Sequence, residues 1–277
     1  MTHASPEPFS LLLPVYAGDH PKHLRRAFES ATTEQTLPPD EVVIVQDGPL
    51  PTALSAELDR LEEECPIPVQ RVRLSRNRGL AIALQEGLQH CSFDIVARAD
   101  ADDVCVPERF AIQVPMIADG LDVVGSALAE FQTDETVIEA VRRRPTESGA
   151  IRRFASFHNP VNHPSVVYRR SAVLAAGGYQ EMPLMEDYWL WARMIVAGAA
   201  IANVEEALVR YRAGSGLYSR RGGLRALRSD WAFQQKAHEI GLTTRVQMVR
   251  NLVQRFGYRV VPDNVRKWGY RLLVARH

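Results

Sequence analysis

The sequence predicts an α/β protein with a mostly parallel sheet flanked by helices and followed by a helical C-terminal extension. Short apolar runs alternate with amphipathic segments of helical length over the first hundred residues, which is typical of βαβ units with right-handed crossovers. Beyond residue 211 the apolar spacing is helical. At 277 residues, the chain is long enough for one large domain with an appendage.

The first hundred residues contain three strand–helix pairs and a fourth strand. The expected strands are 10–16, 41–45, 69–74 and one beginning at 94, and the expected helices are 20–35, 52–65 and 79–90. In the first helix, Leu24, Phe28 and Ala31 recur at helical spacing and form one apolar face. Pro38 and Pro39 then force a turn before the second strand.

The remaining elements are less regular. Further strands are expected at 121–126 and 165–168, and the Arg-, Pro- and Asn-rich region 132–160 is expected to form surface loops. Three helices are expected at the C-terminal end, over 224–240, 244–256 and 264–275. We expect one domain over 1–222, with halves meeting at about 104/105, and a basic helical extension over 223–277.

The formal net charge of zero hides a strong asymmetry. Residues 207–277 hold 15 Lys and Arg against three acids, whereas residues 1–206 hold 18 Lys and Arg against 30 acids. Basic and apolar residues interleave in this C-terminal part, with Trp268 and Tyr270 among them, which suits either an anionic membrane surface or packing with a solvated basic face. The excess of acids in residues 1–206 and the lack of a nucleic-acid-binding motif argue against nucleic-acid binding.

The termini and cysteines indicate a cytoplasmic protein. The N-terminus lacks the charged and apolar run of a signal peptide, and no apolar stretch is long enough to cross a bilayer. Cys65, Cys91 and Cys105 are odd in number, and none has zinc-ligand or redox-motif spacing, so a reducing compartment is the natural interpretation.

An acidic cluster follows the fourth strand, where open α/β sheets place their ligands. Asp100, Asp102 and Asp103 would repel one another without a cation, and hard oxygen ligands favour Mg²⁺ or Mn²⁺. The alternative is a solvated loop or a helix cap, and Asp103 fits that alternative. The turn after the first strand, 14–19, has neither the spaced glycines of a dinucleotide site nor a P-loop, so metal neutralisation is the remaining route to phosphate binding.

Several segments, in this order, resemble the inverting family-two glycosyltransferases, which have the GT-A fold. They are Pro14-Val15-Tyr16, Gln46-Asp47-Gly48, Asn77-Arg78-Gly79, Asp100-Ala101-Asp102-Asp103, Gly177 to Tyr179, Glu186-Asp187 and Val209 to Arg212. The likeness covers nearly the whole chain, and within the family it points to the bacterial transferases of exopolysaccharide and O-antigen assembly, of the amylovoran type.

The resemblance implies a nucleotide-sugar site and a metal. The residues expected to contact the donor are Pro14, Tyr16, Asp47, Asn77, Arg78, Asp100 and Arg212. Asp102, with Asp100, would hold Mg²⁺ or Mn²⁺. Two positions depart from the family: Ala213 stands where a His usually follows the Tyr-Arg pair, and Gln85 where an Asn is frequent. Without that imidazole, phosphate binding would rest on Arg212, helped by Ser219, Arg220 or Arg221.

The resemblance also implies an acceptor site in which Asp187 is the general base. One carboxylate that accepts the proton of the acceptor hydroxyl suffices for inverting transfer. His163, Glu186 and Trp189 are the acceptor-site candidates. The alternatives are structural: acids favour a helix N-terminus, a lone His is usually a hydrogen-bonding group, and Trp189 belongs to a packed helix face.

The implied activity is transfer of a hexose from a nucleotide diphosphate sugar, expected to be a UDP-sugar, to a saccharide acceptor that is expected to be lipid-linked. A peripheral position on the inner face of the plasma membrane would follow. The alternatives are a non-catalytic sugar-nucleotide-binding or membrane scaffold protein, and a nucleotidyltransferase. The Gly-rich loop that nucleotidyltransferases place after their first strand is missing from this sequence.

Overall fold

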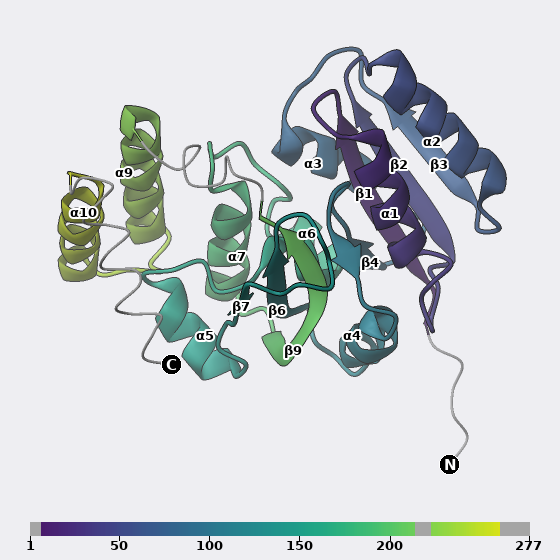
Figure 1. Cartoon of the computed structure of the whole chain (residues 1–277). Coiled ribbons are helices and arrows are strands. Elements are labelled where there is room, and N and C mark those ends of the chain that lie inside the picture. The colour runs from purple at the N-terminus through teal and green to yellow at the C-terminus, as the bar shows by residue number, and fades with distance from the viewer. Residues whose placement is uncertain (1–6, 214–222, 261–277) are drawn as a thin grey trace.

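The computed structural model describes residues 7–213 and 223–260, and within them nine strands join in one sheet (Figure 1). The strand order is β3-β2-β1-β4-β8-β6-β9-β5, and β7 pairs with β6 beside this path. The pairs among β1 to β4 and the pair of β6 with β9 are parallel, whereas β8 runs antiparallel to both β4 and β6. The mostly parallel α/β class expected from the sequence is therefore confirmed.

The first half of the chain forms the expected strand–helix pairs. Its elements are β1 (Phe9–Tyr16), α1 (Pro21–Ala31), β2 (Glu41–Asp47), α2 (Thr52–Glu64), β3 (Val69–Arg73), α3 (Leu80–His90) and β4 (Ile95–Arg98). Alternate side chains of β1 enter the cores on opposite faces of the sheet: Leu12 packs on the face of α3, and Leu11 and Leu13 pack with residues of α1 and α2. Because these strands are parallel, Tyr16 and Asp47 lie side by side at their carboxyl ends.

The second half is more irregular. Its elements are β5 (Val104–Cys105), α4 (Arg109–Ala118), β6 (Val123–Phe131), β7 (Ala140–Arg142), α5 (Ser148–Ala155), a 3₁₀ turn (His163–Ser165), β8 (Val167–Arg169), α6 (Arg170–Ala175), α7 (Glu186–Val196) and β9 (Ile201–Arg212). The long pairing of β6 with β9 contains two register shifts between Ser126 and Leu128.

Several sequence expectations about element limits are wrong. Region 132–160 is not all loop, because it contains β7 and α5, and Ile151 and Ala155 of α5 are buried one turn apart. The strand expected at 165 begins at 167, after the 3₁₀ turn, and the strand expected to end at 126 continues to 131. The first helix ends at 31 rather than 35. The helix expected at 264–275 lies outside the described residues.

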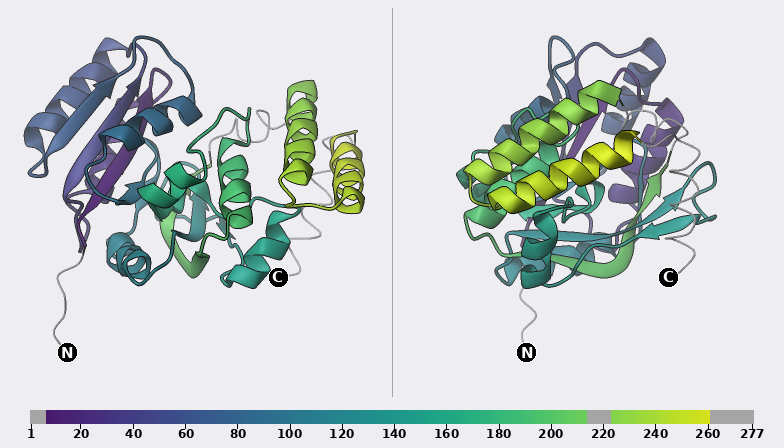
Figure 2. Two further views of the ribbon diagram at one scale, coloured as in Figure 1. Left: turned by 180° about the vertical axis from the view of Figure 1, so that it is seen from behind. Right: turned by 90° about the vertical axis from the view of Figure 1, so that its left-hand side faces the viewer.

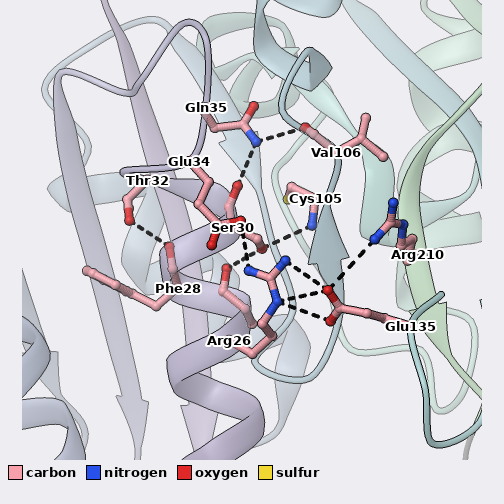
Figure 3. A network of polar contacts seen from close by, with 11 residues as sticks. Arg26, Phe28, Ser30, Thr32, Glu34, Gln35, Cys105, Val106, Glu135 and Arg210 are labelled. Atoms are coloured by element: carbon pink, nitrogen blue, oxygen red, sulfur yellow. Dashed lines mark hydrogen bonds and ion pairs between the residues drawn. The ribbon is translucent and has the colours of Figure 1, made fainter.

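Polar contacts connect the end of α1 to the segment that follows the acidic cluster (Figure 3). The hydroxyl of Ser30 accepts the Cys105 N–H at 3.0 Å, and Gln35 donates to the carbonyls of Ser30 and Val106 at 2.6 and 2.8 Å. These contacts explain why α1 ends before Gln35. Buried backbone groups need polar partners, and the side chains of Ser30 and Gln35 supply them.

The C-terminal helices α9 (Gly223–Glu239) and α10 (Arg245–Val260) run side by side, as the right-hand view of Figure 2 shows. The ring of Phe233 in α9 stacks on Tyr188 of α7 with 3.9 Å between centroids, and Phe233 belongs to the same apolar core as Leu84 of α3. The region 223–260 therefore packs on the second half of the chain. Its division from residues 1–222 as a separate unit stays a prediction.

Candidate donor and acceptor sites

A pocket of about 440 Å³ lies at the carboxyl ends of β1, β2 and β4. It collects residues from four separate segments, because strand ends in a parallel sheet converge at one edge. Its polar lining comprises Tyr16, Asp19, Asp47, Asn77, Asp100 and Asp102, and its apolar lining includes Pro14, Leu80 and Ala83. Six of the expected donor and metal residues are thus neighbours in the structure, although they span almost ninety positions of sequence.

The carboxylate of Asp47 is positioned by the segment that leads into α3. Its two oxygens accept the backbone N–H groups of Arg78 and Gly79 at 2.6 and 2.9 Å. Asn77 donates to the Asp47 carbonyl at 3.4 Å, so it does not cap α3, whose N-cap is Gly79. A side chain at Gly48 would place its Cβ 2.4 Å from the Asn77 nitrogen, and Gly48 has φ +88°, so only glycine fits this close approach.

Two acids in the pocket have strongly raised pKa values. Burial, together with the charge of Asp100, raises the pKa of Asp102 to about 6. Burial raises the pKa of Asp19 to about 7, with further contributions from Asp102 and Asp100, although Asp19 also accepts the Tyr16 N–H at 2.8 Å. Asp100 forms an ion pair with Arg98, whose side chain is 2% exposed. Negative charge is therefore concentrated in this pocket.

Asp103 and Arg212 contact each other next to the acidic cluster. Asp103 is buried and accepts the Arg212 backbone N–H at 2.8 Å, so it is neither solvated nor a helix cap. The Arg212 guanidinium donates to the Asp102 carbonyl at 3.0 Å and lies over the Phe131 ring at 4.5 Å. The structure thus places Arg212 directly against the acidic cluster. Among residues 7–213 and 223–260, no three His, Cys, Asp or Glu side chains come together as a complete metal-ligand set.

A second pair of acids begins α7. Burial, and then the neighbouring charge of Asp187, raises the pKa of Glu186 to about 7, and Asp100 contributes to the same rise. Asp187 accepts a hydrogen bond at 2.6 Å from the Asn159 amide, which comes from the loop after α5. Glu186 is therefore electrostatically coupled to the pocket through Asp100, and the Asp187 carboxylate is positioned by the Asn159 amide.

The other two acceptor-site candidates are buried. His163 hydrogen-bonds Tyr179 at 2.9 Å, and burial together with Arg98 lowers its pKa well below the usual value, so its ring is neutral. Trp189 is 5% exposed and donates to Gln180 at 3.0 Å. Both side chains have partners within the protein, and their contact with an acceptor stays a prediction.

The sequence match and the site geometry lead to the same assignment. The family model described as glycosyl transferase family 2 matches residues 10–175, which span every strand that contributes to the pocket. The chain belongs to this family. It is therefore a glycosyltransferase, as the resemblance implied.

The similarity of this chain to individual glycosyltransferases extends beyond residue 175. It is 37% identical over 270 residues to an uncharacterized glycosyltransferase of Haemophilus influenzae, covering 97% of this chain and 99% of that one. It is 39% identical over 222 residues to the amylovoran biosynthesis glycosyltransferase AmsE of Erwinia amylovora, covering 80% and 82%. It is 28% identical over 270 residues to the UDP-Gal:α-D-GlcNAc-diphosphoundecaprenol β-1,3-galactosyltransferase of Escherichia coli, covering 97% of each.

Solved structures confirm the GT-A fold of the family-2 chain. The mannosyltransferase PcManGT of Pyrobaculum calidifontis, in complex with GDP-Man and Mn²⁺, superposes with a TM-score of 0.65 at 18% identity, covering 90% of this chain and 70% of that one. S. aureus TarS 1–349 in complex with UDP-GlcNAc gives a TM-score of 0.65 at 15% identity, covering 91% and 72%.

Sequence reasoning missed two residues of this family-2 site. Asp19 lines the pocket, and the signal that could have found it is the short turn Tyr16-Ala17-Gly18-Asp19, which returns the carboxylate to the strand end. Arg98 lies two residues before Asp100 and looks like an ordinary exposed residue in the sequence. Its burial depends on packing by β8 and α4, which no local pattern reveals.

Proposed function

We propose that the protein is a metal-dependent inverting transferase that moves a hexose from a UDP-sugar to a lipid-linked saccharide. The observation that carries the donor part is the pocket at the carboxyl ends of β1, β2 and β4, in which Asp19, Asp100 and Asp102 face a shared space. Burial raises the pKa values of Asp19 and Asp102, and the neighbouring carboxylates add to both rises, so a divalent cation in this space would favour their charged forms.

The residues present fit such a cation. Asp102, assisted by Asp100, would hold Mg²⁺ or Mn²⁺ through carboxylate oxygens, which both ions prefer. The cation would neutralise charge that builds on the departing diphosphate. Mn²⁺ in the similar PcManGT complex supports a divalent ion here. Arg212, fixed against the Asp102 carbonyl, would supply a second positive charge to the phosphates.

The protein's own residues divide the remaining tasks. Asp47, with its carboxylate fixed by two backbone N–H groups, would orient the nucleotide base, and Tyr16 and Asn77 would line the same subsite. Asp187 would accept the proton of the acceptor hydroxyl as that oxygen attacks the anomeric carbon from the face opposite the diphosphate. A raised pKa on Glu186 keeps that neighbour partly protonated near neutral pH, which lowers the negative charge beside Asp187.

The acceptor part rests on relatives and on the C-terminal surface. The E. coli relative is named for a diphosphoundecaprenol acceptor. None of the helices in the described ranges is long and apolar enough to cross a bilayer. Peripheral attachment at the inner leaflet fits the basic C-terminal region and the exposed apolar side chains of α10. Arg255 does not serve such a surface, because it pairs with the buried Asp230 at 2.5 Å and bonds the Phe157 carbonyl.

The test compares donor binding and turnover in wild type, Asp102→Ala and a control, Asp119→Ala, which removes an exposed acid outside the pocket. Wild type and control should be stabilised against heat by UDP with Mn²⁺ and should transfer sugar. Asp102→Ala should lose both responses without a lower melting temperature of the free protein, because the change relieves carboxylate repulsion. Full turnover of wild type in excess EDTA would refute metal dependence, and UDP binding without turnover on any acceptor would favour a non-catalytic binding protein.

A further inference from the structure

A second hollow lies away from the donor pocket, between α5, the segment 156–158 and α10. This groove has a volume of about 610 Å³, and we call it the α5–α10 groove. Its polar lining consists of Arg153 from α5, Ser156, His158, and three residues of α10, namely Gln247, Arg250 and Gln254. The rings of Phe154 and Phe157 complete its walls.

The charge of this groove is positive and is not neutralised by the protein. No described residue that lines it is acidic. None of the ion pairs formed within 7–213 and 223–260 involves Arg153 or Arg250, and the Arg250 guanidinium bonds only the amide oxygen of Asn251, at 3.0 Å. Burial together with the charges of Arg255 and Arg144 lowers the pKa of His158, which is the expected effect of a positive field. The groove is therefore complementary to an anion that can accept several N–H donors, such as a phosphate.

The groove has a fixed position beside the candidate base. Its residue His158 precedes Asn159, whose amide bonds Asp187 at 2.6 Å. The end of α5 and the residue that follows it are hydrogen-bonded to two other helices. Asn251 of α10 donates to the Ser156 carbonyl at 2.7 Å, and Tyr188 of α7 donates to the Ala155 carbonyl at 2.7 Å. An anion in the groove would thus lie close to a saccharide that presents its hydroxyl to Asp187.

An apolar stripe runs along α10 beside the groove. Val246, Val249, Val253 and Phe256 are 79, 55, 65 and 59% exposed and recur at helical spacing. Each of the first three precedes a groove residue by one position, so the stripe and the groove lie on adjacent faces of one helix. A polar anion and an apolar chain could therefore contact α10 together, whereas a free sugar phosphate would leave the stripe uncovered.

We propose that the α5–α10 groove binds the diphosphate of the lipid-linked acceptor, with the apolar stripe of α10 directed to the lipid. This inference rests on the proposed function, since it assigns the part of the acceptor that holds the saccharide near Asp187. Arg153 and Arg250 are the principal phosphate contacts, and Gln247 and Gln254 add amide donors.

The test measures binding to phosphatidylcholine vesicles in EDTA, which leaves the donor pocket without its cation. One set of vesicles contains undecaprenyl diphosphate, and a second contains phosphatidylglycerol at matched surface charge. The variants are the double Arg153→Gln/Arg250→Gln and the single Arg153→Glu. The side chain of Arg153 is exposed and makes no hydrogen bond or ion pair in the described structure, so its replacement should leave the packing of α5 intact. Arg60→Gln is the control, because it removes an exposed charge from α2, at the far end of the molecule in Figure 1.

Wild type and Arg60→Gln should bind the undecaprenyl diphosphate vesicles more tightly than the phosphatidylglycerol vesicles. Both groove variants should lose that preference, with affinity for the diphosphate lipid reduced about tenfold or more. Equal binding of the two vesicle types by wild type, or an unchanged preference in the groove variants, would overturn the proposal. Melting temperatures measured with UDP and Mn²⁺ separate the groove proposal from the proposed donor site. The groove variants should still be stabilised by UDP and Mn²⁺. A wild type that is not stabilised by them would refute the proposed donor chemistry and leave the groove proposal untouched.

Discussion

Asp19→Asn should stabilise the metal-free protein at alkaline pH. Burial and the charges of Asp102 and Asp100 raise the Asp19 pKa from 3.8 to about 7, so the folded state binds a proton that the unfolded state has released. The folded protein therefore loses stability as pH rises from about 4 to about 7, and the loss is complete above that window. The asparagine carries no charge, so it removes this pH-dependent cost.

The expected gain in stability follows from the pKa shift of Asp19 and from how far its side chain is exposed. A rise of this size corresponds to about 4 kcal/mol for a fully shielded carboxylate. Because Asp19 is only partly buried, solvent screening reduces the expected gain to about 1–2 kcal/mol. An asparagine side-chain oxygen can still accept the Tyr16 N–H, so the turn should survive.

The assay is a series of melting curves in EDTA across this pH range. The variant should melt about 2–6 °C above wild type at pH 8, and the difference should shrink toward pH 4. Saturating Mn²⁺ with UDP should stabilise wild type more than the variant, because the neutral side chain no longer attracts the cation. Parallel pH profiles for the two proteins, or a variant that melts below wild type at pH 8, would show that Asp19 is not held in a repulsive cluster.

Two further changes test other parts of the site. Asp187→Asn should keep the UDP response and the melting temperature but lower transfer about a hundredfold or more, as expected for loss of a general base, and a product with the donor's anomeric configuration would contradict the inverting mechanism. Gly48→Ala should lower the melting temperature and weaken UDP binding together, since its Cβ would meet the Asn77 nitrogen at 2.4 Å; a variant with wild-type stability would show that the loop before α3 can move aside.

The parts of the fold that sequence predicts are those set by local periodicity. Strands β1 to β4 alternate with helices whose apolar residues recur at helical spacing, and the parallel order then brings strand ends such as Tyr16, Asp47 and Asp100 to one edge. This is why motifs could predict that these residues lie together in one pocket, whereas their contact with a sugar donor stays a prediction.

The rest of the site depends on contacts between distant segments. Arg98 is buried by β8 and α4, and the Asn159 contact with Asp187 joins residues from the loop after α5 and from α7. Helix α5 was missed because its short apolar pattern stands between Pro- and Arg-rich stretches. The basic residues of the C-terminal part were expected to face a membrane or solvent, whereas Arg255 pairs with the buried Asp230 of another helix.

The continuous sheet also limits how the enzyme can respond to substrates. Strands β4 and β8 hydrogen-bond the donor side of the sheet to the acceptor side, so the two sides cannot swing apart or together about a hinge without breaking backbone ladder bonds. Across the part of the chain that the structure describes, helix α7, which carries Asp187, packs in one apolar core with strands β1 and β2 of the sheet that leads to Asp102. We therefore expect any closure over a bound sugar to come from segments beyond the strand ends, and exchange of those segments between relatives to change which sugars are handled while the distance between Asp102 and Asp187 is preserved.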